Sequence, residues 1–157
     1  MTPRAVYDCM VFLQGAARPA GPAAACLRLV DDGNVVLCIS TEILNEVRDV
    51  LTRPETLRRF PELSIEWVAA FVGHLELKGI VFAKVPKAVI LPRDPKDEPY
   101  VNLAIATGAK YLITRDYDLL DLMKDEDFLG RHSGLHILEP VAFLREIARS
   151  METDTES

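Results

Sequence analysis

Short apolar runs alternate with helical stretches along the chain, and most of them end at a polar residue. The runs cover residues 5–7, 35–39, 111–114 and 135–138, with a weaker candidate at 81–85. Continuous apolar runs of this length are typical of strands that are buried on both faces of a parallel sheet. Strands that alternate with helices imply a sheet with helices on both sides. We therefore expect one α/β domain with three α/β/α layers and a mostly parallel central sheet.

The segments between these runs predict helices, and one of them has a clear start. Ser40 is a typical N-cap, and the apolar residues that follow it share one helix face. Further helices are expected at 23–31, 53–60, 64–79, 97–107, 118–123 and 140–150, with loops at 15–22 and 86–95. Residues 151–157 are polar, and we expect them to form a disordered tail after a domain of residues 1–150.

Composition narrows the class of protein. The 157 residues suit a single core, and no apolar run reaches the roughly 18 residues of a membrane helix. The N-terminus lacks the pattern of a signal peptide, so we expect a cytoplasmic protein. Three cysteines without metal-site spacing predict buried free thiols. A net charge of −6 counts against binding nucleic acid through bulk positive charge, although it leaves open an enzyme that holds metal ions.

Several acidic residues occupy positions where a site could form. Asp8 and Asp116 follow buried strands, and ligands of open α/β sheets gather at the carboxyl ends of the strands. Glu46 flanks the apolar stripe of its helix. Glu98 lies in line with the apolar residues of the next predicted helix, and Asp97 lies beside it. Each acid has an ordinary alternative as a turn residue, a helix-start residue or a solvated charge, so only their joint order carries the prediction.

A cluster of such carboxylates would suit hard divalent cations. Mg²⁺ takes oxygen ligands, commonly one or two carboxylates with waters and substrate phosphates. Two ions about 3.5–4 Å apart would stabilise the attacking and leaving oxygens of a phosphodiester hydrolysis. The residues therefore predict a site for one or two metal ions.

The motifs of the chain resemble, in their order, those of the PIN-domain family. The resemblance is greatest to its VapC-like branch of ribonuclease toxins from toxin–antitoxin systems, and it covers about residues 4–147. The motifs that carry it are residues 6–9, 21–23, 40–47, 50–51, 53–54, 93–98, 100–104, 111–116 and 118–120.

The resemblance implies a PIN-like fold and metal-dependent cleavage of RNA with Mg²⁺ or Mn²⁺. It assigns the first acid to Asp8, the helix glutamate to Glu46 and the strand-end acid to Asp116. The third family acid usually stands 18 residues before the strand-end acid, which is Glu98 here, and the adjacent Asp97 is kept as the alternative. It also implies homodimerisation and inhibition by a cognate antitoxin protein.

Three residues near the last acid are candidates for positioning the substrate. Thr114 matches a hydroxyl residue that is frequent in the family, Arg115 could contact a phosphate, and Asp118 follows closely, where it also suits an N-cap. Asp94, which precedes a proline, is interpreted as a turn residue.

One position departs from the family pattern. Family members usually carry Asn two residues after the first acid, and this chain carries Met10. A thioether is a poor substitute for an amide that holds a carboxylate or a water. The alternative function is therefore a catalytically weakened PIN-fold module that binds RNA or a protein partner without cutting. A third possibility, a phosphatase-like or nucleotide-binding enzyme, has little support in the residues after Asp8.

One aromatic pattern allows two interpretations. Trp67, Phe71 and Leu75 recur at four-residue spacing, which favours packing in the core. The same stripe would suit a surface for a dimer or an antitoxin.

Overall fold

The central sheet has five strands, all parallel. The structure, a computed structural model, describes residues 2–91 and 94–156, with side chains for 2–91 and 94–153. The strands run in the order β3-β2-β1-β4-β5. Their bounds are β1 Arg4–Tyr7, β2 Val36–Ser40, β3 Ile80–Phe82, β4 Tyr111–Ile113 and β5 His136–Leu138. The parallel α/β prediction is confirmed, and the weak candidate at 81–85 corresponds to the short edge strand β3.

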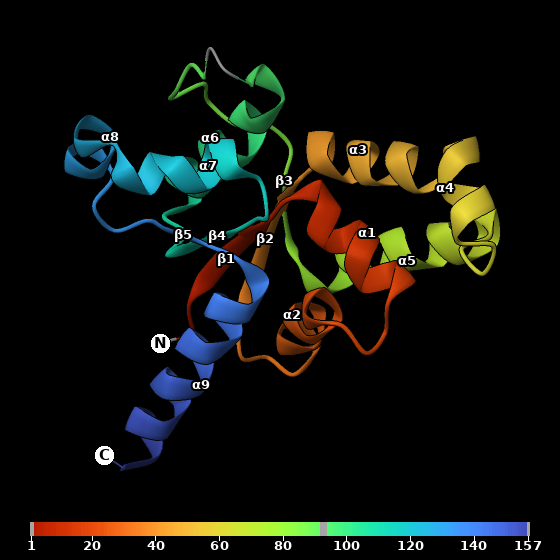
Figure 1. Ribbon diagram of the computed structural model, residues 1–157, viewed down its shortest axis with the longest axis horizontal. Helices are drawn as coiled ribbons and strands as arrows, with labels where there is room; N and C mark the ends of the chain where they lie inside the picture. The colour runs from red at the N-terminus through yellow and green to blue at the C-terminus, as the bar shows by residue number, and fades with distance from the viewer. Residues whose placement is uncertain (1, 92–93, 157) are drawn as a thin grey trace.

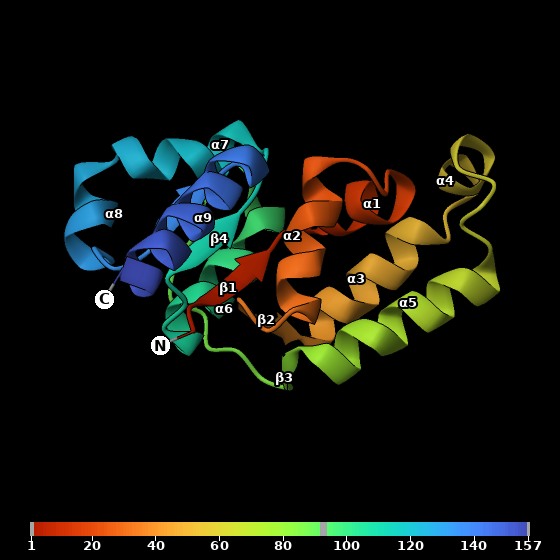
Figure 2. The ribbon, with the colours of Figure 1, turned by 90° about the horizontal axis from the view of Figure 1, so that it is seen from below.

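Helices flank this sheet (Figure 1). The helix α6 contacts β1, β2 and β4, while Phe143 of α9 packs edge-on against Tyr7 and Tyr111. Figure 2 shows α9 in front of β1 and β4, and α6 behind them. The α-helices are α1 Cys9–Ala17, α2 Pro22–Asp31, α3 Thr41–Leu51, α4 Pro54–Arg59, α5 Ile65–Lys78, α6 Glu98–Thr107, α7 Tyr117–Leu120, α8 Glu126–Arg131 and α9 Pro140–Glu156; the 3₁₀ helices are η1 Pro95–Asp97 and η2 Asp121–Lys124.

Helix α1 was not expected from the sequence. It begins directly after β1, because the side chain of Asp8 accepts a hydrogen bond from the backbone N–H of Val11 at 3.1 Å and so caps the helix. Gly15 lets α1 approach α2 closely, since a Cβ at this position would lie 2.5 Å from Leu27 Cδ1. Helix α8, capped by Asp125, was likewise unexpected.

The C-terminal helix is longer than predicted. It continues through Glu156 rather than ending near Ser150, so the predicted disordered tail at 151–157 is wrong for residues 151–156. No proline or glycine interrupts this stretch, and the Thr153 hydroxyl donates a hydrogen bond to the Arg149 carbonyl at 3.1 Å. Ser157 lies outside the described residues.

The buried face of α5 is rotated from the predicted one. Val68, Val72 and Leu75 are buried, whereas Trp67 is 39% exposed and Phe71 is half-buried against it, with ring centroids 5.1 Å apart. The prediction of core packing is therefore confirmed for Leu75 and for the partly buried Phe71, which packs against the core, and is wrong for Trp67. The prediction of buried free thiols is confirmed at all three cysteines, Cys9, Cys26 and Cys38. Among the described residues, no helix is both long and apolar enough to cross a membrane.

The carboxyl ends of β1 and β4 lie side by side, which positions the candidate site. Tyr7 pairs with Ile113, and the backbone N–H of Asp8 donates to the Ile113 carbonyl at 3.0 Å. The two chains therefore leave the sheet at the same edge, and their first polar residues meet there.

Candidate active site

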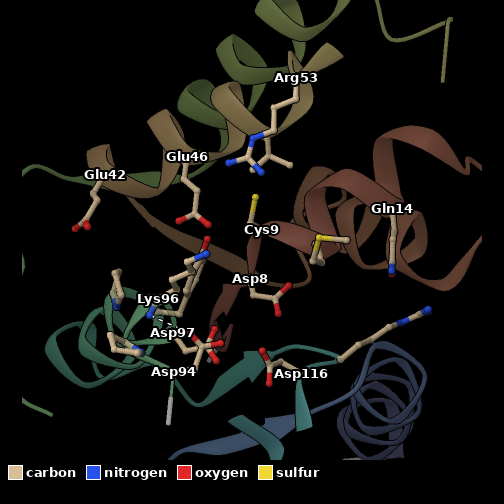
Figure 3. Close-up of a pocket in the computed structure, with 16 residues that line it drawn as sticks. Asp8, Cys9, Gln14, Glu42, Glu46, Arg53, Asp94, Lys96, Asp97 and Asp116 are labelled. Carbon is tan, nitrogen blue, oxygen red and sulfur yellow. Dashed lines mark hydrogen bonds between the residues drawn. The ribbon is translucent and has the colours of Figure 1, made fainter. Parts of the chain in front are cut away.

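An acidic cavity of about 890 Å³ opens at this edge of the sheet (Figure 3). Its walls come from the start of α1, one face of α3, the segment from η1 into α6, and the loop after β4. The acidic lining residues are Asp8, Glu42, Glu46, Asp94, Asp97 and Asp116; the basic ones are Arg53, Lys96 and Arg115. In Figure 3, Glu42 and Glu46 extend from α3, and Arg53 from the turn between α3 and α4, on the side opposite Asp94, Asp97 and Asp116.

Asp8 is buried and held from two sides. Its Oδ1 accepts from the Val11 N–H, and its Oδ2 accepts a short hydrogen bond from the Thr114 hydroxyl. Burial raises the pKa of Asp8 to about 6; the hydrogen bond from Thr114 lowers this pKa, and the charge of Asp116 raises it.

Thr114 joins the two strand-end acids. While its hydroxyl donates to Asp8, its oxygen accepts from the backbone N–H of Asp116 at 2.9 Å. Thr114 is fully buried and does not line the cavity, and its predicted part in positioning the substrate stays a prediction. Its hydroxyl group links the Asp8 carboxylate to the backbone of Asp116.

Three aspartates bring their carboxylates together beside Asp8. Asp94, Asp97 and Asp116 each have a carboxylate oxygen within 4.8 Å of the others. Burial, together with the nearby charges of Asp116 and Asp94, raises the pKa of Asp97 to about 7. The Asp97 Oδ2 is buried and has no hydrogen-bond partner among the described residues. This atom therefore lacks the donor or cation that a buried carboxylate oxygen needs.

Two of these acids also act as helix caps. The Asp94 side chain accepts from the Lys96 N–H at 3.1 Å, and the Asp116 side chain accepts from the Asp118 N–H at 2.8 Å. The turn role that the sequence indicated for Asp94 is thus present, but its part in the acidic cluster was missed. Its spacing of three residues from Asp97, across a proline, is the signal that could have revealed it.

Glu98 is directed elsewhere. Its Oε1 accepts a hydrogen bond from the Leu91 N–H at 2.8 Å, and its side chain lines a different cavity, together with Ser40 and Asn102. Because Asp97 is the N-cap of α6 and Glu98 its first residue, the two side chains leave the chain in different directions. The structure places Asp97, and not Glu98, in the acidic cavity.

The other predicted residues are distributed around the cavity. Glu46 is half-buried in its wall, Arg115 is exposed on its lining, and Met10 is 47% exposed on the same lining. Asp118 lines an adjacent smaller cavity, which also contacts Asp94 and Asp97. Arg53, which the site prediction did not include, lines the main cavity and forms an ion pair with Asp49 at 3.0 Å.

The donor set fits a divalent cation. Carboxylate oxygens are the preferred ligands of Mg²⁺ and related ions, and three of them converge here with a fourth carboxylate nearby. A bound cation would supply the missing partner of Asp97 Oδ2 and offset the mutual repulsion of the acids.

Fold and site together define an α/β domain with an acidic cluster of metal-binding type at the carboxyl edge of a parallel sheet. The family model described as PIN domain matches residues 4–118, and the chain belongs to this family. PIN domains are generally metal-dependent nucleases, and the acidic cluster agrees with that class. A search of curated proteins finds no match to the chain.

Proposed function

We propose that this protein is an endoribonuclease that depends on Mg²⁺ or Mn²⁺. The observation that carries the proposal is the convergence of Asp94, Asp97 and Asp116 beside the buried Asp8. Membership of the PIN domain family supports the nuclease class. The choice of RNA as substrate rests on the sequence resemblance described above.

Different residues of the cavity would bind the metal ion and the substrate. Asp94, Asp97 and Asp116 would hold the ion, with Asp8 and Glu46 contributing from β1 and α3. When bound, such an ion activates water and stabilises charge that develops on a phosphate. Thr114 keeps the Asp8 carboxylate oriented, so the site does not need to rearrange that group.

Cationic side chains on the cavity lining would bind the substrate backbone. Arg53 stands on the α3 side, while Arg115 follows β4 beside Asp116. An arginine guanidinium can pair with a phosphate through two hydrogen bonds. These two residues explain how a chain with a net charge of −6 could still hold a polyanion locally.

The direct test is cleavage of an end-labelled, mixed-sequence single-stranded RNA with Mn²⁺ or Mg²⁺. We expect cleavage that EDTA abolishes and that Asp116→Asn lowers by about a hundredfold or more, the order expected when a metal site loses a ligand. Asp127→Asn is the matched control, because Asp127 is an exposed residue paired with Arg131 outside the cavity. DNA of the same sequence tests the choice of substrate.

The same assay separates the alternative function. If the folded wild type cuts none of several RNAs with either metal, the nuclease proposal fails, and the protein is a PIN-fold module that binds RNA or a partner. The exposed Met10 on the cavity lining favours that alternative, because its thioether provides no amide there. Cleavage restored by Met10→Asn would then identify Met10 as the cause.

We further propose that the protein is the cytoplasmic toxin of a type II toxin–antitoxin pair, acting as a homodimer that a cognate antitoxin inhibits. The support is the resemblance to the toxin branch of the family. Induced expression should arrest growth in a manner that depends on Asp116, and co-expression of a small protein encoded next to the gene should relieve the arrest. Normal growth with an active wild-type nuclease would contradict the toxin role.

A further inference from the structure

Tyr100 has a buried hydroxyl that no described residue satisfies. It lies in the first turns of α6, its side chain is 2% exposed, and it lines the acidic cavity. Its hydroxyl oxygen is buried and has no hydrogen-bond partner among the described residues.

Such a hydroxyl is unfavourable in the protein without a ligand. Removing a phenol O–H from water without a compensating hydrogen bond costs free energy, whereas phenylalanine would fill the same space at no such cost. Buried polar groups of native proteins are nearly always paired, so an unpaired one needs an explanation. A partner that arrives with the filled site would provide it.

The groups around the hydroxyl identify its acceptor. Cys9 and Glu46 line the same cavity as Tyr100 and are the neighbours whose charges act on its hydroxyl. A phenol and a thiol both carry their protons near neutral pH at their ordinary pKa values. Of these three groups, only the Glu46 carboxylate is a strong acceptor.

We propose that Tyr100 is a positioning residue for Glu46, to which its hydroxyl donates a hydrogen bond, directly or through one water, when the cavity holds a divalent cation. The inference rests on the proposed metal-dependent function. Hydrogen bonds of active sites are often long before ligands bind, and one water can bridge the remaining gap. The bond would fix one oxygen of Glu46 and leave the other free for the cation or its water.

The test compares Tyr100→Phe with Tyr111→Phe in the full chain. Tyr111 is equally buried, at 2% exposure, but does not line the cavity. Calorimetric titration with Mn²⁺ should show affinity weakened about tenfold by Tyr100→Phe, the usual order for losing a group that orients a metal ligand. Tyr111→Phe should bind Mn²⁺ as the wild type does. Without metal, Tyr100→Phe should melt at the same temperature as the wild type or higher.

Introducing Tyr100→Phe into a Glu46→Gln protein distinguishes an effect that acts through Glu46 from a general effect on packing. In Glu46→Gln protein, Tyr100→Phe should weaken Mn²⁺ binding no further, because the residue it orients is already lost. Equal Mn²⁺ affinity of wild type and Tyr100→Phe, or a full additional loss in the Glu46→Gln background, would overturn the inference while leaving the metal site intact. A folded wild type that binds no Mn²⁺ would overturn the proposed function together with it.

Discussion

Asp97→Asn is expected to lower metal-dependent cleavage by about a hundredfold or more, while Glu98→Gln is expected to keep it within about threefold of the wild type. Asp97 belongs to the group of carboxylates that lie within 4.8 Å of one another, and its buried Oδ2 has no other partner. Glu98 is engaged with the Leu91 N–H instead. Glutamine keeps the acceptor oxygen for that bond, so Glu98→Gln is a matched control for a change of charge alone.

The measurement is the initial cleavage rate at saturating Mn²⁺, together with Mn²⁺ affinity. Both the cleavage rate and the Mn²⁺ affinity should be lower for Asp97→Asn than for Glu98→Gln. If Glu98→Gln loses activity and Asp97→Asn retains it, the third acid is the one that the family spacing indicates, and the arrangement described here does not represent the active protein.

Asp8→Asn is expected to abolish cleavage and to stabilise the metal-free protein by about 3 kcal/mol at pH 8. The pKa of Asp8 is about 6 in the folded chain, against 3.8 for an unperturbed aspartate. The folded state therefore binds more protons than the unfolded state between these pH values. The stability linked to Asp8 is complete below about pH 3.8 and is lost as the pH rises through about 6. The pKa of Asp97 is about 7, so this residue continues the loss of stability to higher pH.

Urea unfolding between pH 5 and pH 8 in the presence of EDTA would measure this effect. The wild type should lose stability across the range, Asp8→Asn should lose less, and Mn²⁺ should restore the wild type at pH 8. Thr114→Val removes the hydroxyl that donates to Asp8 and so should raise the pKa of Asp8 further. The variant should therefore continue to lose stability at higher pH than the wild type does. A wild type whose metal-free stability is constant over this range would show that the Asp8 carboxyl is not destabilised by burial.

The class of fold and the approximate composition of the site follow from the amino-acid sequence. Runs of three to five apolar residues followed by polar ones locate strand ends, because a buried strand must stop where a charged side chain needs solvent or a partner. Asp8 and Asp116 could be placed at one edge of the sheet by this argument, and Glu46 by the apolar stripe of its helix. These patterns are local, so no knowledge of packing was needed.

Helix starts and ends were harder to infer. Helix α1 depends on a cap from Asp8, which the sequence indicated as a site acid or as the start of a loop. One side chain can do both, because its Oδ1 meets Val11 while its Oδ2 meets Thr114. The full length of α9 was missed because polar composition alone does not distinguish an exposed helix from a disordered tail.

Which acids meet, and how they are held, depends on the packing of segments that are far apart in the chain. The side chains of adjacent residues at a helix start point in directions about 100° apart. A family spacing of 18 residues therefore indicates the helix start but does not show whether Asp97 or Glu98 faces the site. The membership of Asp94 and the burial of Thr114 and Tyr100 depend on the close approach of η1, α3, α6 and the β4 loop. Contacts between segments far apart in the chain leave no periodic signal in the sequence, and at this site such contacts set the direction of each functional side chain.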